Sequence, residues 1–243
     1  ITGQINVEYK SPEEAEKLYL NLYANDIARF EFNAISKYQI TDKLTSAYFF
    51  HGNINRYSLD MNHDSFVDVP LSDQLNFMTR LSYNGTNYES KTILQALNVN
   101  QKAGQMDFVN NIQNKTNWGA TADIQRVNLI TKNGYVFDGE KFRSIGTIVS
   151  ITHHKQNSLF GNKVFETEQN SGYVNLLWQS NFDPTHKHSG GEEHEDHHSD
   201  EGTKHDYITG LSLSYNNYLQ YLDGRNYSTT EFVPGAFMEY TFS

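Results

Sequence analysis

The chain has 243 residues, no cysteine and a formal net charge of −10, and 14% of its residues are aromatic. The absence of cysteine excludes disulfide scaffolds, thiolate zinc sites and cysteine nucleophiles. The acidic balance, without any cluster of Lys and Arg, argues against nucleic-acid binding. No run of about 20 apolar residues is present, so the sequence predicts no membrane-spanning helix, while the aromatic content is too high for a wholly disordered chain.

Apolar and polar residues alternate with a period of two along nearly the whole chain, and this period predicts β-strands. In segment 17–25, for example, Leu18, Leu20 and Leu22 alternate with Tyr19 and Asn21. The predicted strands, in chain order, are 17–25, 29–39, 44–51, 76–83, 88–98, 120–130, 142–154, 171–181, 207–216 and 233–242. The fold class expected is therefore all-β and antiparallel, with about ten strands.

Most of these segments have the roughly nine to eleven residues that a tilted membrane strand requires, whereas soluble strands most often have about five or six. In the segment 207–216, Leu211 and Leu213 lie at the middle of one face, between Tyr207 and Tyr215 at its ends. Aromatic residues at both ends of an apolar stretch are typical of the two interfaces of a membrane. The alternative is a large soluble antiparallel sheet whose apolar faces meet in a core.

The predicted connections are short after the second and fourth strands and long after the third, fifth, seventh and ninth. Long loops on one side and short turns on the other are typical of outer-membrane barrels. Three connections are exceptions to this asymmetry: the connection after the first strand is short although it lies on the predicted long-loop side, and the connections at 131–141 and 182–206 are longer although they lie on the predicted short-turn side.

Residues 2–10 begin with Thr-Gly-Gln-Ile-Asn-Val, and residues 17–25 are rich in Leu and Tyr. These two segments, followed by 60–70, 173–180 and 233–242, resemble in the same order segments of the TonB-dependent outer-membrane receptors of two-membrane bacteria. The resemblance implies that residues 1–10 are the last strand of a plug domain. It implies that residues 11–243 are the N-terminal part of a 22-stranded transmembrane β-barrel, of which about ten strands are present.

The same resemblance implies that the chain is a fragment of an active transport receptor. It also implies that this receptor is located in the bacterial outer membrane. The TonB energy-coupling complex would be its partner through a segment absent here, and outer-membrane lipid would surround it. Charged residues on the inward faces would line the lumen and contact the plug. These residues are Arg29, Glu31, Arg80, Arg126 and Glu239.

A tract rich in His and acidic residues, expected as an insert at 183–206, contains six of the ten His of the chain. Imidazole and carboxylate are ligands of Zn, Cu, Ni and Fe, so the tract predicts capture of a transition metal. The candidate ligands are His186, His188, His194, His197, His198, His205, Glu192, Glu193, Glu195 and Asp196. The alternative is a solvated insert whose histidines bind nothing. Because the tract follows the eighth predicted strand, entry of the chain from the periplasm would place it in the periplasm.

Asp60, Asn62 and Asp64 have the D-x-N-x-D spacing of calcium loops that bind through oxygen ligands, and Asp68 follows. The sequence therefore predicts a candidate calcium site at Asp60, Asn62, Asp64 and Asp68, although Ser65 replaces the usual Gly. The alternative is an outer loop ordered by Asx turns. We expect His153 and His154, at a predicted strand end, to be rim residues.

No nucleophile elbow, phosphate-binding loop or metalloprotease helix occurs in the sequence, so we expect no enzyme. The expected function is TonB-dependent transport of a metal ion or metal chelate of the siderophore type, without a required cofactor. Two alternatives are a surface or secreted β-sheet module that sequesters metal, and a small stand-alone outer-membrane barrel. Solubility without detergent would identify the module, and heat-modifiable gel mobility would identify the small barrel.

Overall fold

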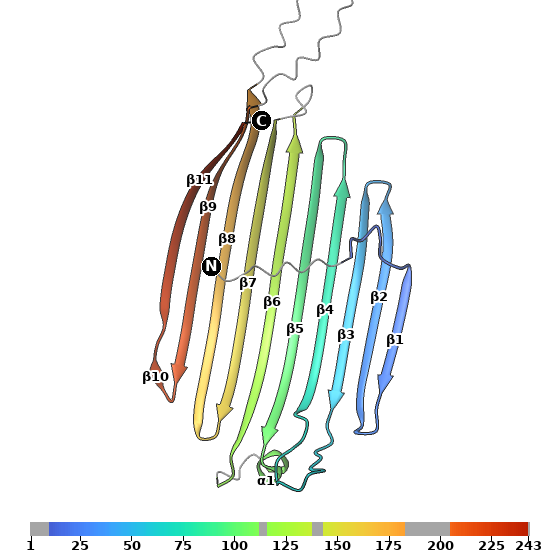
Figure 1. Cartoon of the computed structure of the whole chain (residues 1–243), viewed down its shortest axis with the longest axis vertical. Helices are drawn as coiled ribbons and strands as arrows, with labels where there is room; N and C mark the ends of the chain where they lie inside the picture. The colour runs from blue at the N-terminus through green and yellow to red at the C-terminus, as the bar shows by residue number, and fades with distance from the viewer. Residues whose placement is uncertain (1–9, 112–115, 138–142, 183–204, 243) are drawn as a thin grey trace, which may run out of the picture.

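The computed structural model describes residues 10–111, 116–137, 143–182 and 205–242, and it consists almost entirely of one antiparallel sheet (Figure 1). The strands are β1 (Leu18–Ala24), β2 (Arg29–Thr41), β3 (Leu44–Asn55), β4 (Leu71–Asn84), β5 (Tyr88–Gly104), β6 (Gly119–Val136), β7 (Ser144–Phe160), β8 (Lys163–Phe182), β9 (His205–Leu222), β10 (Arg225–Asn226) and β11 (Thr229–Phe242). A five-residue helix, α1 (Met106–Asn110), lies between β5 and β6. Strands β1 to β9 pair in chain order, and both β10 and β11 pair with β9.

All ten predicted strands are present, and the all-β antiparallel class is confirmed. The long connections expected after the seventh and ninth strands are wrong, because β7 to β11 extend through those residues. Gly161, at φ 60°, helps to form a short turn between β7 and β8. Asp223 and Gly224, at φ 50° and 74°, form an Asp-Gly turn of the kind favoured in two-residue hairpins.

The two ends of the sheet differ in their connections. One end, here called the turn end, carries the turns at 42–43 and 85–87, and the opposite end, here called the loop end, carries the loops 56–70 and 105–118. In Figure 1 the turn end is at the top and α1 marks the loop end. β8 ends and β9 begins at the turn end although 22 residues separate them in the sequence, so the predicted asymmetry of loop lengths holds only for the two loops just named.

Strand pairing sorts the side chains onto two faces, because residues opposite each other in a ladder point to the same side. One face, here called the apolar face, contains Leu20, Phe50, Phe77, Leu129 and many similar side chains across all the long strands. The other, here called the mixed face, combines polar side chains such as Asn33, His51 and Arg126 with apolar ones such as Phe49 and Ile93. Both assignments follow from the pairing register.

Charged residues are distributed unequally between the two faces. On the apolar face, the charged strand residues all lie toward the loop end; they are Asp73, Lys102, Asp123, Lys155, Glu166 and Glu168. On the mixed face, charges occur at every height of the sheet, from Arg29 near the loop end through Arg126 to Lys91 near the turn end. The middle of the apolar face therefore forms an uncharged band across the strands.

Aromatic side chains follow the turn end of the apolar face. The ring centroids of Tyr83 and Tyr88 are 5.8 Å apart, those of Tyr135 and Phe137 are 5.2 Å apart, and those of Phe137 and Trp178 are 5.5 Å apart. The uncharged band is thus bounded on this side by a row of aromatic residues.

The apolar face has no second layer over it among the described residues. Only six hydrophobic side chains of the described residues are buried, and none of them lies on the apolar face of a strand: Ala15, Ala47, Met78, Val99, Phe108 and Val109. In contrast, Leu22, Leu211 and Met238 on the apolar face are 79%, 61% and 70% exposed. The described part of the chain therefore lacks the two-layer core that the soluble-sheet alternative requires. Its one helix, α1, is not of a length and apolarity that would cross a membrane.

Candidate functional site

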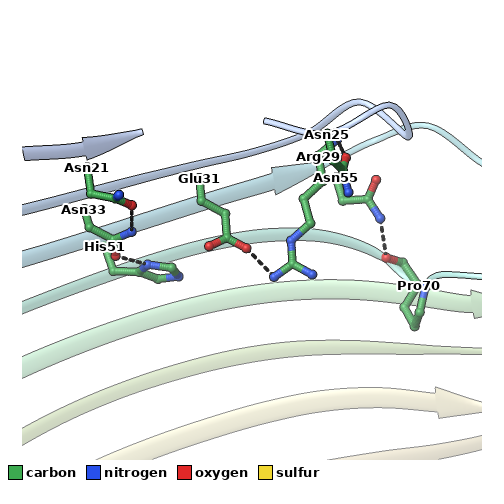
Figure 2. Close-up of polar contacts among 8 residues, drawn as sticks. All are labelled: Asn21, Asn25, Arg29, Glu31, Asn33, His51, Asn55 and Pro70. Atoms are coloured by element: carbon green, nitrogen blue, oxygen red, sulfur yellow. Dashed lines mark hydrogen bonds and ion pairs between the residues drawn. The ribbon is translucent and has the colours of Figure 1, made fainter. Parts of the chain in front are cut away.

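The mixed face carries a network of polar contacts across the first three strands (Figure 2). Asn33 Nδ2 donates to Asn21 Oδ1 at 3.3 Å, and Nδ1 of His51 lies 2.7 Å from Asn33 Oδ1. These three residues occupy facing positions on β1, β2 and β3. Toward the loop end, Arg29 forms an ion pair with Glu31 on the same strand. The network joins neighbouring strands through side chains as well as through the backbone.

Two buried amides near this ion pair have acceptors without partners. Asn53 and Asn55 are 7% and 2% exposed, and the Oδ1 atom of each accepts no hydrogen bond from the described residues. Asn55 Nδ2 donates to Pro70 O at 2.9 Å. Most buried polar atoms in proteins are hydrogen-bonded, so this part of the mixed face offers acceptors to any donor group that covers it.

The segment 10–16, which precedes β1, packs on the mixed face near the turn end. Lys37 Nζ donates to Glu13 O at 2.6 Å, Asn84 Nδ2 donates to Glu13 Oε1 at 3.0 Å, and Arg80 donates to Lys10 O. Partial burial raises the pKa of Glu13, but hydrogen bonds from Ser82 and other groups outweigh it, so the pKa is lowered overall. The carboxylate thus helps to tie the chain entering the sheet to this face.

The five charged residues predicted to line a lumen all lie on the mixed face. The register places Arg29, Glu31, Arg80, Arg126 and Glu239 there. Arg80 donates a hydrogen bond to the backbone oxygen of Lys10, the last residue of the predicted plug strand. The predicted plug strand itself, residues 1–10, lies outside the described residues except for Lys10.

The predicted calcium loop is ordered by its own carboxylates. Asp60 accepts hydrogen bonds from the backbone amides of Asp64 at 3.1 Å and Ser65 at 2.8 Å. Asp68 Oδ2 accepts from the amide of Met61 at 2.7 Å, and Asp64 Oδ1 accepts from the amide of Phe66 at 2.8 Å. This is the arrangement expected of Asx turns.

Among the described residues, no group of three or more His, Asp or Glu side chains is placed to hold a metal ion. The calcium site at Asp60, Asn62, Asp64 and Asp68 therefore stays a prediction.

The two loops at the loop end pack on each other. Val67 N donates to Gly104 O, and Met106 N donates to Ser65 O, each at 2.9 Å. The rings of Phe66 and Trp118 lie 6.4 Å apart, and Phe108 of α1 is 2% exposed. The sequence did not predict α1, because a single helical turn is too short to show a period of 3.6 residues.

The histidines for which the sequence predicts a role fall into two groups. The predicted metal ligands between 186 and 198 lie outside the described residues, and of His205 only the backbone is described, paired with Phe182 and Phe242. His153 and His154 are not rim residues as predicted, because β7 continues to Phe160 and both lie within it. His153 Nδ1 lies 2.8 Å from Asn170 Oδ1 on the apolar face.

Comparisons with known proteins give no relative for this fold and site. No family model, no curated protein and no solved structure matches the chain.

Proposed function

We propose that the chain is part of the barrel wall of an outer-membrane, TonB-dependent active transporter whose substrate is a metal ion or a metal chelate. The observation that carries the proposal is the uncharged band on the apolar face. An Arg or Lys on the lipid face of a membrane barrel costs about 2–4 kcal/mol at the bilayer midplane. On the apolar face, charged residues occur only toward the loop end, as expected for a face that contacts lipid. On the mixed face, charged residues occur at every height, as expected for a face that contacts water or protein.

Two further features support the same placement. The aromatic row at the turn end suits a membrane interface, where Tyr and Trp are enriched. The segment 10–16 lies on the mixed face, as expected for a chain that enters the barrel wall from a domain inside the lumen. With the aromatic row taken as the periplasmic interface, the connection 183–204 falls on the periplasmic side.

In this proposal, the outer loops and the apices of a plug capture the substrate, and TonB-driven rearrangement of the plug opens the lumen. The role is transport without catalysis. A metal or metal chelate is proposed as the substrate because six of the ten His lie at 186–205. A tract on the periplasmic side would receive ions after their passage.

Detergent partitioning tests the membrane placement. We expect the chain to enter the detergent phase of a Triton X-114 separation and to float with phospholipid vesicles in a density gradient. A chain that stays in the aqueous phase and remains monomeric without detergent would overturn the transporter and leave the metal-sequestering module.

Metal binding is tested with two variants, one in which the six His of the tract are replaced and one in which the other four His are replaced. Replacing the six His at 186, 188, 194, 197, 198 and 205 by Asn should remove most of the Zn²⁺ retained in equilibrium dialysis. Replacing the other four, His51, His63, His153 and His154, is the matched control and should leave retention nearly unchanged. Equal loss in both variants would contradict a role for the tract.

A further inference from the structure

The apolar face is hollowed where a glycine replaces a larger side chain. A groove of about 550 Å³ crosses β1 to β4 around Gly52. Gly52 lies opposite Phe32 on β2 and opposite Leu75 on β4, so the missing side chain leaves a gap between these two. The apolar side chains that line the groove are Leu22, Phe30, Phe32, Phe50, Ile54 and Leu75. Its volume lies within the range of about 300–1,000 Å³ found for ligand pockets.

The end of this groove toward the loops is cationic. A second hollow of about 280 Å³ continues it, lined by Arg56, Asp73 and Lys102 among others. The two hollows adjoin because Ile54, in the first, faces Asp73, in the second. Arg56 donates three hydrogen bonds to Asp73 from Nε and Nη2, at 2.9 to 3.1 Å. Its Nη1 group has no such bond among the described residues, and its side chain is 71% exposed.

Lys102 adds a second positive charge to the same end. It follows Asn100 by two residues on β5, faces Leu71 on β4, and has no ion-pair partner in the described part of the chain. The side chains that line this hollow carry two positive charges and one negative charge, and the next carboxylate on this face is Asp123, opposite the lining residue Asn100. A site that is apolar at one end and cationic at the other is complementary to an amphiphile with an anionic head.

We propose that this groove binds one molecule of an anionic phospholipid, with an acyl chain in the hollow at Gly52 and the phosphate at Arg56 and Lys102. The inference rests on the membrane placement proposed above and adds a specific lipid site to it. A peptide suits the groove poorly, because its backbone amides would find few polar partners between Phe32, Phe50 and Leu75. Phosphate is favoured as the anion because a guanidinium binds it through several N–H groups at once.

Native mass spectrometry of the chain in a non-ionic detergent tests the site directly. With dioleoylphosphatidylglycerol at a low molar ratio, we expect one tightly held lipid per chain. Dioleoylphosphatidylcholine, which has the same acyl chains and no net charge, should bind at least tenfold more weakly. Inorganic phosphate alone and dioleoylglycerol alone should each fail to compete with the phospholipid, because each fills only one of the two hollows.

Two glycine variants separate the groove from the rest of the apolar face. A Cβ atom at Gly52 would lie 3.6 Å from a ring carbon of Phe50, which is an ordinary contact, so Gly52→Val should fold and fill the groove. It should reduce occupancy by phosphatidylglycerol about tenfold. Gly172→Val is the matched control, because Gly172 lies on the same face on β8 and a Cβ there meets no atom within 4 Å.

Charge variants test the cationic end without changing the groove. Arg56→Gln combined with Lys102→Gln should abolish the preference for phosphatidylglycerol over phosphatidylcholine. Lys155→Gln, on the apolar face of β7, should preserve it. If Gly52→Val fails to fold, which far-ultraviolet circular dichroism would reveal, the charge variants alone test whether the groove binds the anionic lipid.

Equal loss of lipid in Gly52→Val and Gly172→Val, or an unchanged lipid preference in the charge variant, would overturn the lipid site. Neither result would contradict the transporter proposal, which is tested by detergent partitioning of the chain. Conversely, a chain that partitions into water yet binds phosphatidylglycerol in a Gly52-dependent way would retain the lipid site and lose the transporter.

Discussion

The carboxylate of Asp223 joins two turns at the loop end of the sheet. Its Oδ2 atom accepts a hydrogen bond from Lys163 Nζ at 2.6 Å, and its Oδ1 atom accepts one from Val164 N at 2.9 Å. The hydrogen bond from Lys163 is the main reason that the pKa of Asp223 is lowered. Because the folded state prefers the charged form, the stabilisation is present above the ordinary pKa of Asp, about 3.9, and is lost as the pH falls through the lowered value.

We therefore predict that the amide of Val164 exchanges slowly with solvent at pH 6 and several-fold faster, after correction for intrinsic rates, below the folded pKa of Asp223. Asp223→Asn should show the fast exchange already at pH 6, because Asn carries no charge to pair with Lys163. Hydrogen exchange followed by mass spectrometry measures both. Asp26→Asn, in the β1–β2 turn, is the control and should leave Val164 unchanged. Equal protection of Val164 at both pH values would contradict the role of Asp223.

The loop 60–68 is held by its own carboxylates and should be ordered without a metal ion. Since Asp60 accepts hydrogen bonds from the amides of Asp64 and Ser65, we expect these amides to be protected from exchange in EDTA. Asp60→Ala should remove about 1.5–3 kcal/mol of local stability for each charged hydrogen bond lost. Protection that appears only with added Ca²⁺ would instead show that the metal orders the loop.

Adjacent residues of one strand should differ in their response to the same substitution. Leu211 lies on the apolar face of β9 and Ser212 on its mixed face, opposite Gly235 of β11. We predict that Leu211→Arg weakens transfer into phospholipid vesicles by about 2–4 kcal/mol, the cost of Arg on a lipid face. Ser212→Arg should change it by less than about 1 kcal/mol, because polar substitutions facing away from lipid avoid that cost.

Vesicle flotation of the two variants, with circular dichroism to compare their strand content, measures this difference. Similar losses for Leu211→Arg and Ser212→Arg would mean that the two faces meet the same environment. That result would contradict the membrane placement of the whole sheet.

Sequence periodicity predicted the parts of the strands in which apolar residues alternate with polar ones. It missed the ends of strands in which this alternation stops. β8 is predicted from 171, where Val174 and Leu176 mark one face, but it begins at Lys163. Between these points Glu166, Glu168 and Asn170 occupy the apolar face, so the alternation of polarity disappears although the strand continues. For the same reason His153 and His154 were placed at a strand end. The helix α1 is fixed by tertiary contacts of Phe108 and Val109, which no local pattern records.

The candidate sites were predictable to different degrees. The shared face of Arg29, Glu31 and Arg80 follows from strand parity alone. The groove at Gly52 forms because Phe32 on β2 and Leu75 on β4 lie opposite Gly52. The register of β2 and β4 against β3 sets these neighbours, and the sequence of β3 alone does not predict that register. The same is true of the contact between the loops 56–70 and 105–118.

The described sheet has two open edges. The outer edges of β1 and β11 pair with no other described strand. Unpaired backbone groups along a strand promote association with other strands, and inside a membrane they carry a cost of several kcal/mol each. Pro234 on β11 is compatible with an edge, because it lacks an N–H group and so donates no ladder hydrogen bond. β1, from Leu18 to Ala24, contains no proline, so every backbone N–H group that points away from β2 is able to donate.

We predict that the isolated chain does not close on itself. Closure of these strands would join β1, with seven residues, to β11, with fourteen, and would leave half of β11 unpaired. In a detergent extract the unheated chain should therefore migrate like the boiled chain, near its mass of 28.0 kDa, or as higher oligomers formed through the free edges. A compact band that moves only on boiling would show a closed small barrel, since closure makes such barrels resist unfolding by detergent. That outcome would contradict the proposal that the chain is part of a larger barrel wall and would support a stand-alone barrel, because closing β1 onto β11 leaves no edge for further strands.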